Sequence, residues 1–425
     1  MSAIDAPLVK PQTGAVVFIF VTVLLDMFAL GLIMPVLPKL VESFVDNDTA
    51  GAARIFGLFG TAWALMQFFF SPVLGALSDR FGRRPVVLLS NLGLALDYVL
   101  MALAPTLIWL FIGRVISGIT SASISTAFAY IADITPPDRR AAVFGKIGLA
   151  FGAGFILGPA LGGLLGGMDP RLPFWVAAGL SFANFLYGLL ILPESLPKDR
   201  RAPFRWRSAN PVGALKLLRS NHMLAGLAVV TFIGQVAHVV LPSTFVLYAT
   251  YRYGWDEKTV GLTFAMVGIC AMVVQGTAIG PVVKRFGERK ALLFGICCGA
   301  IGFLIFGAAP TGPLSWLGIP LMALWGIANA ATQALMSRLV APDQQGALQG
   351  ANTSVQAVSQ LVGPLLFTLT FAYFIGGSAP WIMPGAPFLL ASVLLVLALL
   401  IAVRVLAGMK PDEPGPVRLS APPLP

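Results

Sequence analysis

Hydrophobic residues in this chain gather in long runs that are separated by short polar segments. Twelve runs of about 20 residues occur, and each is long enough as an α-helix to cross roughly 30 Å of hydrocarbon. None shows the two-residue alternation of a transmembrane β-strand. The pattern predicts an all-α membrane protein with twelve transmembrane helices, at approximately residues 15–38, 52–76, 86–104, 106–132, 142–167, 173–192, 223–250, 258–283, 290–309, 314–340, 346–374 and 384–407.

Composition supports this assignment. Hydrophobic residues make up 57% of the chain and charged residues 11%, whereas charged residues are about a quarter of a soluble globular protein. The first run is too long for a signal-peptide core and lacks a basic n-region and a small-residue cleavage site, which predicts a retained helix. The three cysteines lie inside apolar runs without ligand-like spacing, which indicates buried small residues rather than a disulfide or metal site.

The net charge of +10 is concentrated in alternate loops, which argues against a nucleic-acid-binding surface. Loops after even-numbered helices are rich in Lys and Arg, and loops after odd-numbered helices are short or nearly neutral. Because basic loops stay on the cytoplasmic side, both termini are predicted to be cytoplasmic. The predicted domains are a first six-helix bundle (1–192), a basic linker (193–221), a second six-helix bundle (222–408) and a proline-rich tail (409–425).

The second half repeats features of the first at an offset of 205 residues. The segment GALSDRFGRR, residues 75–84, matches GPVVKRFGER, residues 280–289. The offset recurs where Pro137-Asp138, Gly145 and Gly158-Pro159 correspond to Pro342-Asp343, Gly350 and Gly363-Pro364. Two parallel copies of a six-helix unit are typical of secondary transporters. Since Asp79 corresponds to Lys284, the second copy of the loop is expected to lack the acidic part of the motif.

Three ionisable residues lie deep within predicted helices. At 1.5 Å per residue, Asp26 and Asp97 lie about 17 Å from the cytoplasmic ends of helices 1 and 3, and Arg114 lies about 18 Å from the same face. A charge at this depth costs at least ~2.5 kcal/mol and is typically functional. Titration of a carboxylate beside a guanidinium or a cationic substrate is the chemistry that proton coupling needs. A structural ion pair that does not titrate is the alternative.

Several motifs resemble the major facilitator superfamily. GALSDRFGRRP is similar to the superfamily's loop between helices 2 and 3, and GAGFILGPALGG, residues 152–163, resembles the helix-5 signature of its drug:proton antiporters. The segments LDMFALGLIMPVLP, ALDY, SGITSASISTAFAYIADIT, YGWDEKTVG and QQGALQG resemble the tetracycline-efflux branch over nearly the whole chain. The resemblance implies the major facilitator fold of two pseudo-symmetric six-helix bundles. It also places helices 1 and 4 beside the central cavity, which favours Asp26 and Arg114 over Asp97 for proton coupling.

The resemblance implies a cytoplasmic gate at the loop between helices 2 and 3. Asp79 is expected to accept hydrogen bonds from Arg83 and from the arginines before helix 5, and the arginines of the loop also fix its topology. Gly75 is expected to allow close packing and Gly82 a tight turn. The expected gate residues are Gly75, Asp79, Arg80, Gly82, Arg83, Arg84 and Arg139.

The helix-5 signature places glycines at every fourth position on one face, around a proline that bends the helix. Such a face suits a moving or sealing interface, and ordinary small-residue packing is the alternative. The residues of this motif are Gly154, Gly158, Pro159, Gly162 and Gly163.

The second half carries one histidine and several amides within its helices. Each can orient a ligand, and each can equally hydrogen-bond or pack between helices. The candidates for substrate binding are Gln235, His238, Gln275, Asn329, Gln333 and Gln356. Because no metal-ligand pattern, nucleotide loop or hydrolase motif occurs in the required context, neither a cofactor nor enzymatic activity is expected.

The sequence departs from tetracycline exporters at two positions. Cys298 stands where their ninth helix has an aspartate, and Ala271 stands near the position of an eighth-helix histidine. The resemblance therefore implies proton-coupled export of a hydrophobic drug, tetracycline-like or multidrug, by a monomer in the bacterial inner membrane. The alternatives are a symporter or facilitator that imports a metabolite, and a non-transporting receptor or scaffold.

Overall fold

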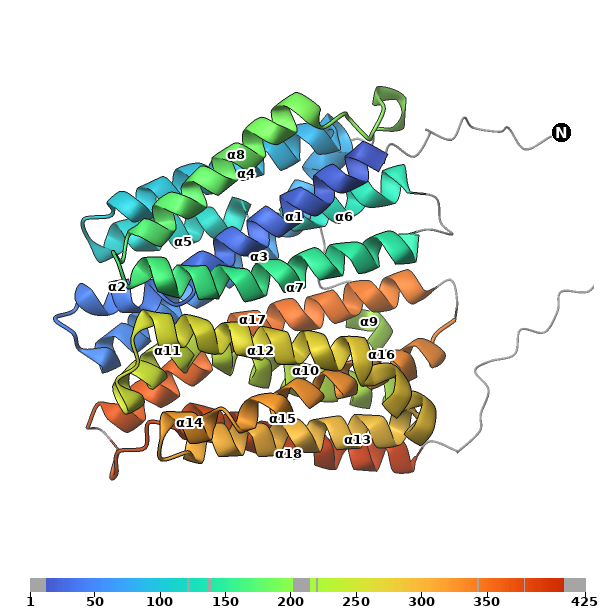
Figure 1. Ribbon diagram of the computed structural model, residues 1–425. Coiled ribbons are helices and arrows are strands. Elements are labelled where there is room, and N and C mark those ends of the chain that lie inside the picture. Colours follow the sequence, from blue (N-terminus) through green and yellow to red (C-terminus); the bar gives the residue numbers. More distant parts are fainter. Residues whose placement is uncertain are drawn as a thin grey trace, which may run out of the picture. The chain divides into compact units, whose positions relative to one another are not determined.

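All regular secondary structure in the described part of the computed structural model is helical, and this part contains no strand (Figure 1). It comprises residues 13–120, 123–135, 140–201, 215–218, 221–341, 344–377 and 379–408. The helices are α1 (Thr13–Ile33), α2 (Leu37–Ser43), α3 (Thr49–Phe81), α4 (Arg83–Leu103), α5 (Leu107–Thr120), α6 (Ser123–Ile134), α7 (Arg140–Gly166), α8 (Leu172–Ile191), η1 (Lys198–Arg200), α9 (Leu215–Leu218), α10 (His222–His238), α11 (Val240–Tyr253), α12 (Glu257–Thr277), α13 (Ile279–Ala308), α14 (Gly312–Ser315), α15 (Gly318–Leu324), α16 (Gly326–Arg338), α17 (Gln345–Ile375) and α18 (Ala386–Ala407).

Eleven helical segments among these residues are long and apolar enough to cross a membrane. The predicted fourth span is present as two shorter helices, α5 and α6, on either side of residues 121–122. The all-helical membrane fold predicted from the sequence is therefore confirmed. Several ends differ from the prediction because polar residues extend the apolar runs as helix. The second helix continues to Phe81, so that Asp79 and Arg80 lie in its last turn.

Contacts within the chain group it into two compact units. The first contains residues 1–210, 242–269 and 364–382, and the second contains residues 211–241, 270–363 and 383–425. The grouping assigns parts of α11, α12 and α17 to the first unit, so it follows contacts rather than chain order. The sequence-based domain boundaries stay a prediction.

In the first unit, α1 packs between α7 and α8, and α4 packs against α5 and α8 (Figure 1). A core of fully buried side chains holds α1 to α6 and α7, and it includes Phe18, Ile19, Tyr130, Ile131 and Ile147. Each such side chain contributes about 1.5–3 kcal/mol when it is buried from water. In a bilayer that gain applies to insertion, and close packing then orders the helices against one another.

Gly82 separates α3 from α4. Its φ of 106° belongs to the left-handed region, which a residue with a Cβ rarely adopts. The tight turn predicted at this position is therefore confirmed. Gly287, 205 residues later, makes the same break inside α13 with a φ of 75°, so the internal repeat extends to backbone conformation.

In the second unit, α13 packs against α15, α16 and α18, and α10 packs against α18. The predicted span 314–340 is divided into α14, α15 and α16. Pro313 and Pro320 each stand within the first three residues of a short helix, where the missing amide hydrogen costs least. Prolines thus mark the interruptions without ending the span.

Candidate functional site

Asp26 lies on α1 and is buried, with 9% of its surface exposed. The amide nitrogen of Asn184, on α8, donates a hydrogen bond of 3.1 Å to Asp26 Oδ1. Asn184 Oδ1 accepts a hydrogen bond of 3.1 Å from the Thr22 hydroxyl. Thr22 and Asp26 are four residues apart, so they occupy the same face of α1. The carboxylate of Asp26 is therefore held inside the first unit by α8. No spacing or motif in the sequence indicates this pairing.

Asp97 on α4 lies close enough to Arg114 on α5 to interact with it electrostatically. Both Asp97 carboxylate oxygens and Arg114 Nε are buried without a hydrogen bond of normal geometry in the described part of the chain, although the Ser117 hydroxyl on α5 interacts with Asp97. The Arg114 guanidinium instead lies 5.5 Å from the ring centre of Trp63. Buried polar groups without partners are rare in folded proteins and costly. Asp97 and Arg114 thus combine charge proximity with unused hydrogen-bonding capacity.

Tyr98 connects the two acidic positions. It is buried beside Asp97 on α4 and interacts electrostatically with Asp26, Asp97 and Arg114. Gly113 permits the close approach of α5, since a Cβ there would lie 2.9 Å from Asp97 Oδ1. The three ionisable residues predicted from depth alone therefore belong to one buried cluster of the first unit. Their role in proton coupling stays a prediction.

Arg83 is the centre of a polar cluster where α3 ends and α4 begins. Its guanidinium contacts Asp79 at 2.6 Å, Asp133 at 3.1 Å and the Ser78 hydroxyl at 2.6 Å. Its backbone amide donates to Glu194 Oε1 at 2.8 Å. The expected contact between Asp79 and Arg83 is present. Asp133 and Glu194 were not predicted, because only the fold brings the ends of α6 and α8 to this turn.

The other predicted gate residues have weaker contacts. Arg84 donates a hydrogen bond of 2.7 Å to the carbonyl oxygen of Leu189, and Arg80 lies 5.2 Å from the ring centre of Phe81. No described atom lies within 4 Å of the position that a Cβ would take at Gly75. The close packing predicted for Gly75 is therefore not found within its unit. Arg139 lies outside the described residues.

The helix-5 glycines of α7 face two different neighbours. A Cβ at Gly154 would lie 2.7 Å from Met27, and a Cβ at Gly158 would lie 2.7 Å from the backbone of Gly31. A Cβ at Gly162 would clash with the carbonyl oxygen of Leu32, which also lies on α1. Gly163 instead faces Gly261 on α12, and a Cβ there would lie 3.1 Å from Gly261 Cα. Glycine at these four positions is required by backbone contact.

Pro159 lies inside α7 and takes part in both contacts. Its side chain faces Gly31, where a Cβ would lie 2.8 Å from Pro159 Cδ. Its carbonyl oxygen faces Gly261 of α12.

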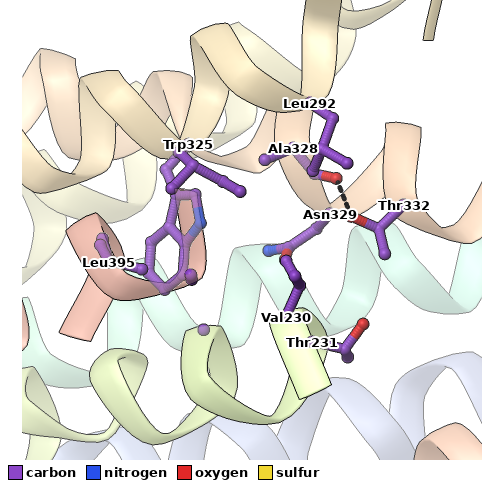
Figure 2. Close-up of a pocket in the computed structure, with 11 residues that line it drawn as sticks. Val230, Thr231, Leu292, Trp325, Ala328, Asn329, Thr332 and Leu395 are labelled. Carbon is purple, nitrogen blue, oxygen red and sulfur yellow. Dashed lines mark hydrogen bonds between the residues drawn. The ribbon is translucent and has the colours of Figure 1, made fainter. Parts of the chain in front are cut away.

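All six predicted substrate-binding residues belong to the second unit. Asn329 lines a small hollow together with Trp325, Thr231 and Thr332 (Figure 2). The ring centre of His238 lies 5.8 Å from that of Trp325. Gln333 accepts a hydrogen bond of 2.7 Å from the Asn352 amide, so this residue makes the interhelical hydrogen bond that is the alternative to ligand binding. The exposed residues of the group are Gln275, Asn329, Gln356 and His238.

The second unit carries its own ion pair at the repeat of the α3–α4 turn. Glu288 Oε1 accepts a hydrogen bond of 2.6 Å from Arg338 Nη2. These positions correspond to Arg83 and Asp133 at the offset of 205 residues, with the two charges exchanged. The expectation that the second copy lacks an acid is therefore wrong. The acid is displaced from the position of Asp79 to that of Arg83.

Comparisons with known proteins agree with this architecture. The sequence profile of the Major Facilitator Superfamily matches residues 19–364 and 244–424. The chain belongs to the major facilitator superfamily. It is 40% identical over 364 residues to the class C tetracycline resistance protein of Escherichia coli, which covers 85% of this chain and 90% of the relative. It is also 40% identical to the class G protein of Vibrio anguillarum, over 84% of this chain and 90% of the relative.

Solved structures of major facilitator proteins share the fold. The human organic anion transporter MFSD10 (TETRAN) is 26% identical and superposes with a TM-score of 0.67, covering 92% of this chain and 100% of that protein. The nucleoside transporter NupG (D323A mutant) superposes with a TM-score of 0.76 at 14% identity, covering 92% and 99%. The chain is thus a multi-pass membrane transporter, and the predicted resemblance to the tetracycline-efflux branch is confirmed.

The structure shows the two positions at which the sequence departs from tetracycline exporters. Cys298 is buried in α13, and Ala271 lies in α12. Both belong to the second unit. Among the described residues, no group of three His, Cys, Asp or Glu side chains is arranged to hold a metal ion.

Proposed function

We propose that this chain is a proton-coupled antiporter that exports a hydrophobic drug across the bacterial inner membrane by alternating access. The relatives at 40% identity are tetracycline resistance proteins, which supports export of a drug. The single observation that carries proton coupling is the buried cluster of Asp26, Asp97 and Arg114 within one unit. No catalytic role is proposed for any residue.

Proton exchange is assigned to Asp26 and Asp97. Transfer of a charged carboxylate into hydrocarbon is unfavourable, so a proton or a cation must balance it when the site closes. Arg114 supplies one positive charge near Asp97, and a single neutral amide faces Asp26. A cationic or zwitterionic drug and a proton can therefore compete for the same charge balance. Entry of the proton on one side and of the drug on the other gives antiport.

The Arg83 cluster is proposed as the cytoplasmic latch. It joins the ends of α3 and α6 with the segment after α8, through the contacts to Asp79, Asp133 and Glu194. Charge-assisted hydrogen bonds of this kind are strong enough to favour one arrangement and weak enough to break in a transport cycle. The latch would hold one cytoplasmic arrangement of the first unit until the carboxylates change protonation.

The helix-5 glycines are proposed to seal the first unit at the end opposite to the cytoplasmic latch. Gly154, Gly158 and Gly162 pack α7 closely on α1, and Gly163 meets Gly261 of α12. Backbone contacts without side chains leave no space for water or ions between the helices. Such a seam prevents proton leakage while the cytoplasmic side is open.

Substrate binding is proposed for the polar residues of the second unit. Asn329, His238 and Gln356 are the favoured candidates, because their side chains are exposed. Cys298 and Ala271 replace an acid and a histidine of tetracycline exporters, which favours a drug other than a metal–tetracycline complex. The protein is proposed to act as a monomer. Both termini are proposed to lie in the cytoplasm, because the basic loops follow the even-numbered members of the twelve predicted transmembrane spans.

Transport assays with everted membrane vesicles test this proposal. An acidic vesicle interior should drive uptake of at least one compound from a panel containing tetracycline and ethidium, and uptake should collapse when the pH gradient is dissipated. Vesicles without the protein serve as the control. Proton-driven uptake into right-side-out vesicles instead would establish import. An absence of flux for every compound under any imposed pH difference would overturn proton-coupled transport.

A further inference from the structure

Asn184 is the unassigned polar residue with the most specific contacts in the first unit. It is completely buried in the middle of α8. Its amide nitrogen donates to Asp26 Oδ1 at 3.1 Å and lies 3.4 Å from the Thr22 carbonyl oxygen. Its carbonyl oxygen accepts from the Thr22 hydroxyl at 3.1 Å. Every polar atom of the side chain therefore has a partner on one face of α1.

The contacts determine the orientation of the amide. A rotation by 180° would turn the Asn184 carbonyl oxygen toward the Asp26 carboxylate and the Thr22 carbonyl, which are both acceptors. The Thr22 hydroxyl would then have to exchange its role from donor to acceptor. The observed orientation is the one that suits an ionised Asp26. Protonation of Asp26 weakens this preference and leaves only the Thr22 carbonyl, at 3.4 Å, as a fixed acceptor, so the amide responds to the charge of the carboxylate.

Other ionisable groups around Asp26 are few. On α4, Tyr98 interacts electrostatically with Asp26 and links it to Asp97 and Arg114. The side chains described on α7 and α8 include no charged group. On α6, Tyr130 donates to the Pro193 carbonyl at 2.9 Å, and Asp133 pairs with Arg83. Among the described side chains, Asn184 is thus the hydrogen-bond donor to Asp26.

We propose that Asn184 is a positioning residue that holds the Asp26 carboxylate and sets the pH at which it exchanges its proton. This inference rests on the proposed proton coupling through Asp26. A hydrogen bond to the charged form favours that form, and the effect is larger where water is excluded. Thr22 acts one step further away, because its hydroxyl orients the amide that contacts the carboxylate.

Infrared spectroscopy of the purified full-length protein tests this role without any drug. The carbonyl stretch of a protonated carboxylic acid is followed from acid to alkaline pH, and the band absent from Asp26→Asn is assigned to Asp26. In Asn184→Leu the midpoint of this band should move to higher pH by about one to two units, as expected for loss of a hydrogen bond to a charged group. Thr22→Val should shift it in the same direction by less, and Thr22→Ser should leave it unchanged.

The control is Ser181→Ala, since Ser181 lies on the same helix, is buried and has no hydrogen-bond partner in the described residues. This change removes a buried hydroxyl without touching Asp26, so the midpoint should stay. A thermal melt of each variant reports folding, and Thr22→Val keeps the test available if Asn184→Leu does not fold. Identical midpoints in wild type, Asn184→Leu and Thr22→Val would overturn the inference, as would an Asp26 band that does not titrate. A shifted band without drug flux would sustain the role of Asn184 and refute transport instead.

Discussion

Glu288 and Arg338 form an ion pair of 2.6 Å that repeats, with exchanged charges, the pair of Arg83 and Asp133 in the first unit. Both pairs join residues that are 50 positions apart, and in each pair the first residue directly follows a glycine with positive φ. The geometry of the turn is thus retained in the two copies while its polarity is reversed. An ion pair needs opposite charges but not a particular order, so both arrangements satisfy the same backbone.

The reversed pair predicts that exchanging its charges is tolerated. Glu288→Arg alone places like charges together and should destabilise the protein by roughly 1 kcal/mol, since Arg338 is largely exposed and screened by solvent. The double variant Glu288→Arg with Arg338→Glu should recover most of that loss in thermal unfolding. Losses that simply add in the double variant would contradict the pairing.

The latch predicts unequal roles for neighbouring arginines. Arg83→Gln removes the contacts to Asp79 and Asp133 and should slow transport by roughly tenfold, which corresponds to about 1.4 kcal/mol and is the size of one charge-assisted hydrogen bond. Arg80→Gln is the control, because Arg80 is exposed and contacts only the Phe81 ring among the interactions described. Initial rates and half-saturating drug concentrations separate an effect on the transport rate from an effect on drug binding. Weakened drug binding at an unchanged maximal rate in Arg83→Gln would argue against a latch.

The buried cluster predicts that proton coupling depends on Asp26 and Arg114. Asp26→Asn keeps a polar side chain of nearly the same shape beside Asn184 but cannot lose a proton, so accumulation against a gradient should be abolished. Arg114→Ala leaves Asp97 without its positive neighbour and should have the same effect. Membrane insertion should be normal in both, as judged by the amount of folded protein. Undiminished pH-dependent exchange would refute the assignment of this site.

The α7 seam predicts a contrast between glycines of one helix. Gly158→Ala introduces a Cβ 2.7 Å from the backbone of Gly31 and should cost about 1–3 kcal/mol, because neither backbone can yield easily. Gly148→Ala, on the same helix, meets no described atom within 4 Å and should be neutral or stabilise the helix by up to about 1 kcal/mol. Thermal unfolding and proton leakage into vesicles measure both. Equal behaviour of the two variants would remove the argument for a tight seam.

Asp256 predicts a pH-dependent contribution to stability at the start of α12. Hydrogen bonds from the Thr259 hydroxyl and, to a lesser extent, from the Thr259 backbone amide, which lies 2.9 Å from Asp256 Oδ1, lower the pKa of Asp256 below its usual value. A lowered pKa means that the stabilisation is present above the ordinary pKa of an aspartate and is lost as the pH falls through the folded-state value. Asp256→Ala should therefore destabilise the protein by less than about 1 kcal/mol at neutral pH, because the group is exposed and screened by solvent. The difference from wild type should vanish in acid, and a constant difference would exclude the cap.

Much of the fold could be predicted because hydrocarbon imposes strict rules on sequence. Length and apolarity located the spans, and the repeat located equivalent turns in both halves. The depth of Asp26, Asp97 and Arg114 followed from counting residues along helices, since an unpaired charge in a bilayer is seldom accidental. The turn at Gly82 was predictable for another local reason, because only a glycine readily adopts that backbone conformation.

Partners between distant helices could not be predicted in this way. Asn184 lies 158 residues from Asp26, and Glu194 lies 111 residues from Arg83. Neither pair shows a spacing or motif, because such contacts depend on which helix faces which neighbour. Packing of polar side chains inside a membrane is decided by shape and hydrogen bonding between helices, not by the hydrophobic pattern of any one of them.

The sequence by itself determined a helical membrane protein of two related halves, with three ionisable residues at mid-depth, because span length and the cost of buried charge are local properties of the chain. Only the tertiary structure decided that Asp26 is held by Asn184, that Asp97 and Arg114 share a cluster without saturating their hydrogen bonds, and that the second unit reverses the charges of the first. Those relationships arise from the packing of helices that are distant in sequence, and no single segment encodes them.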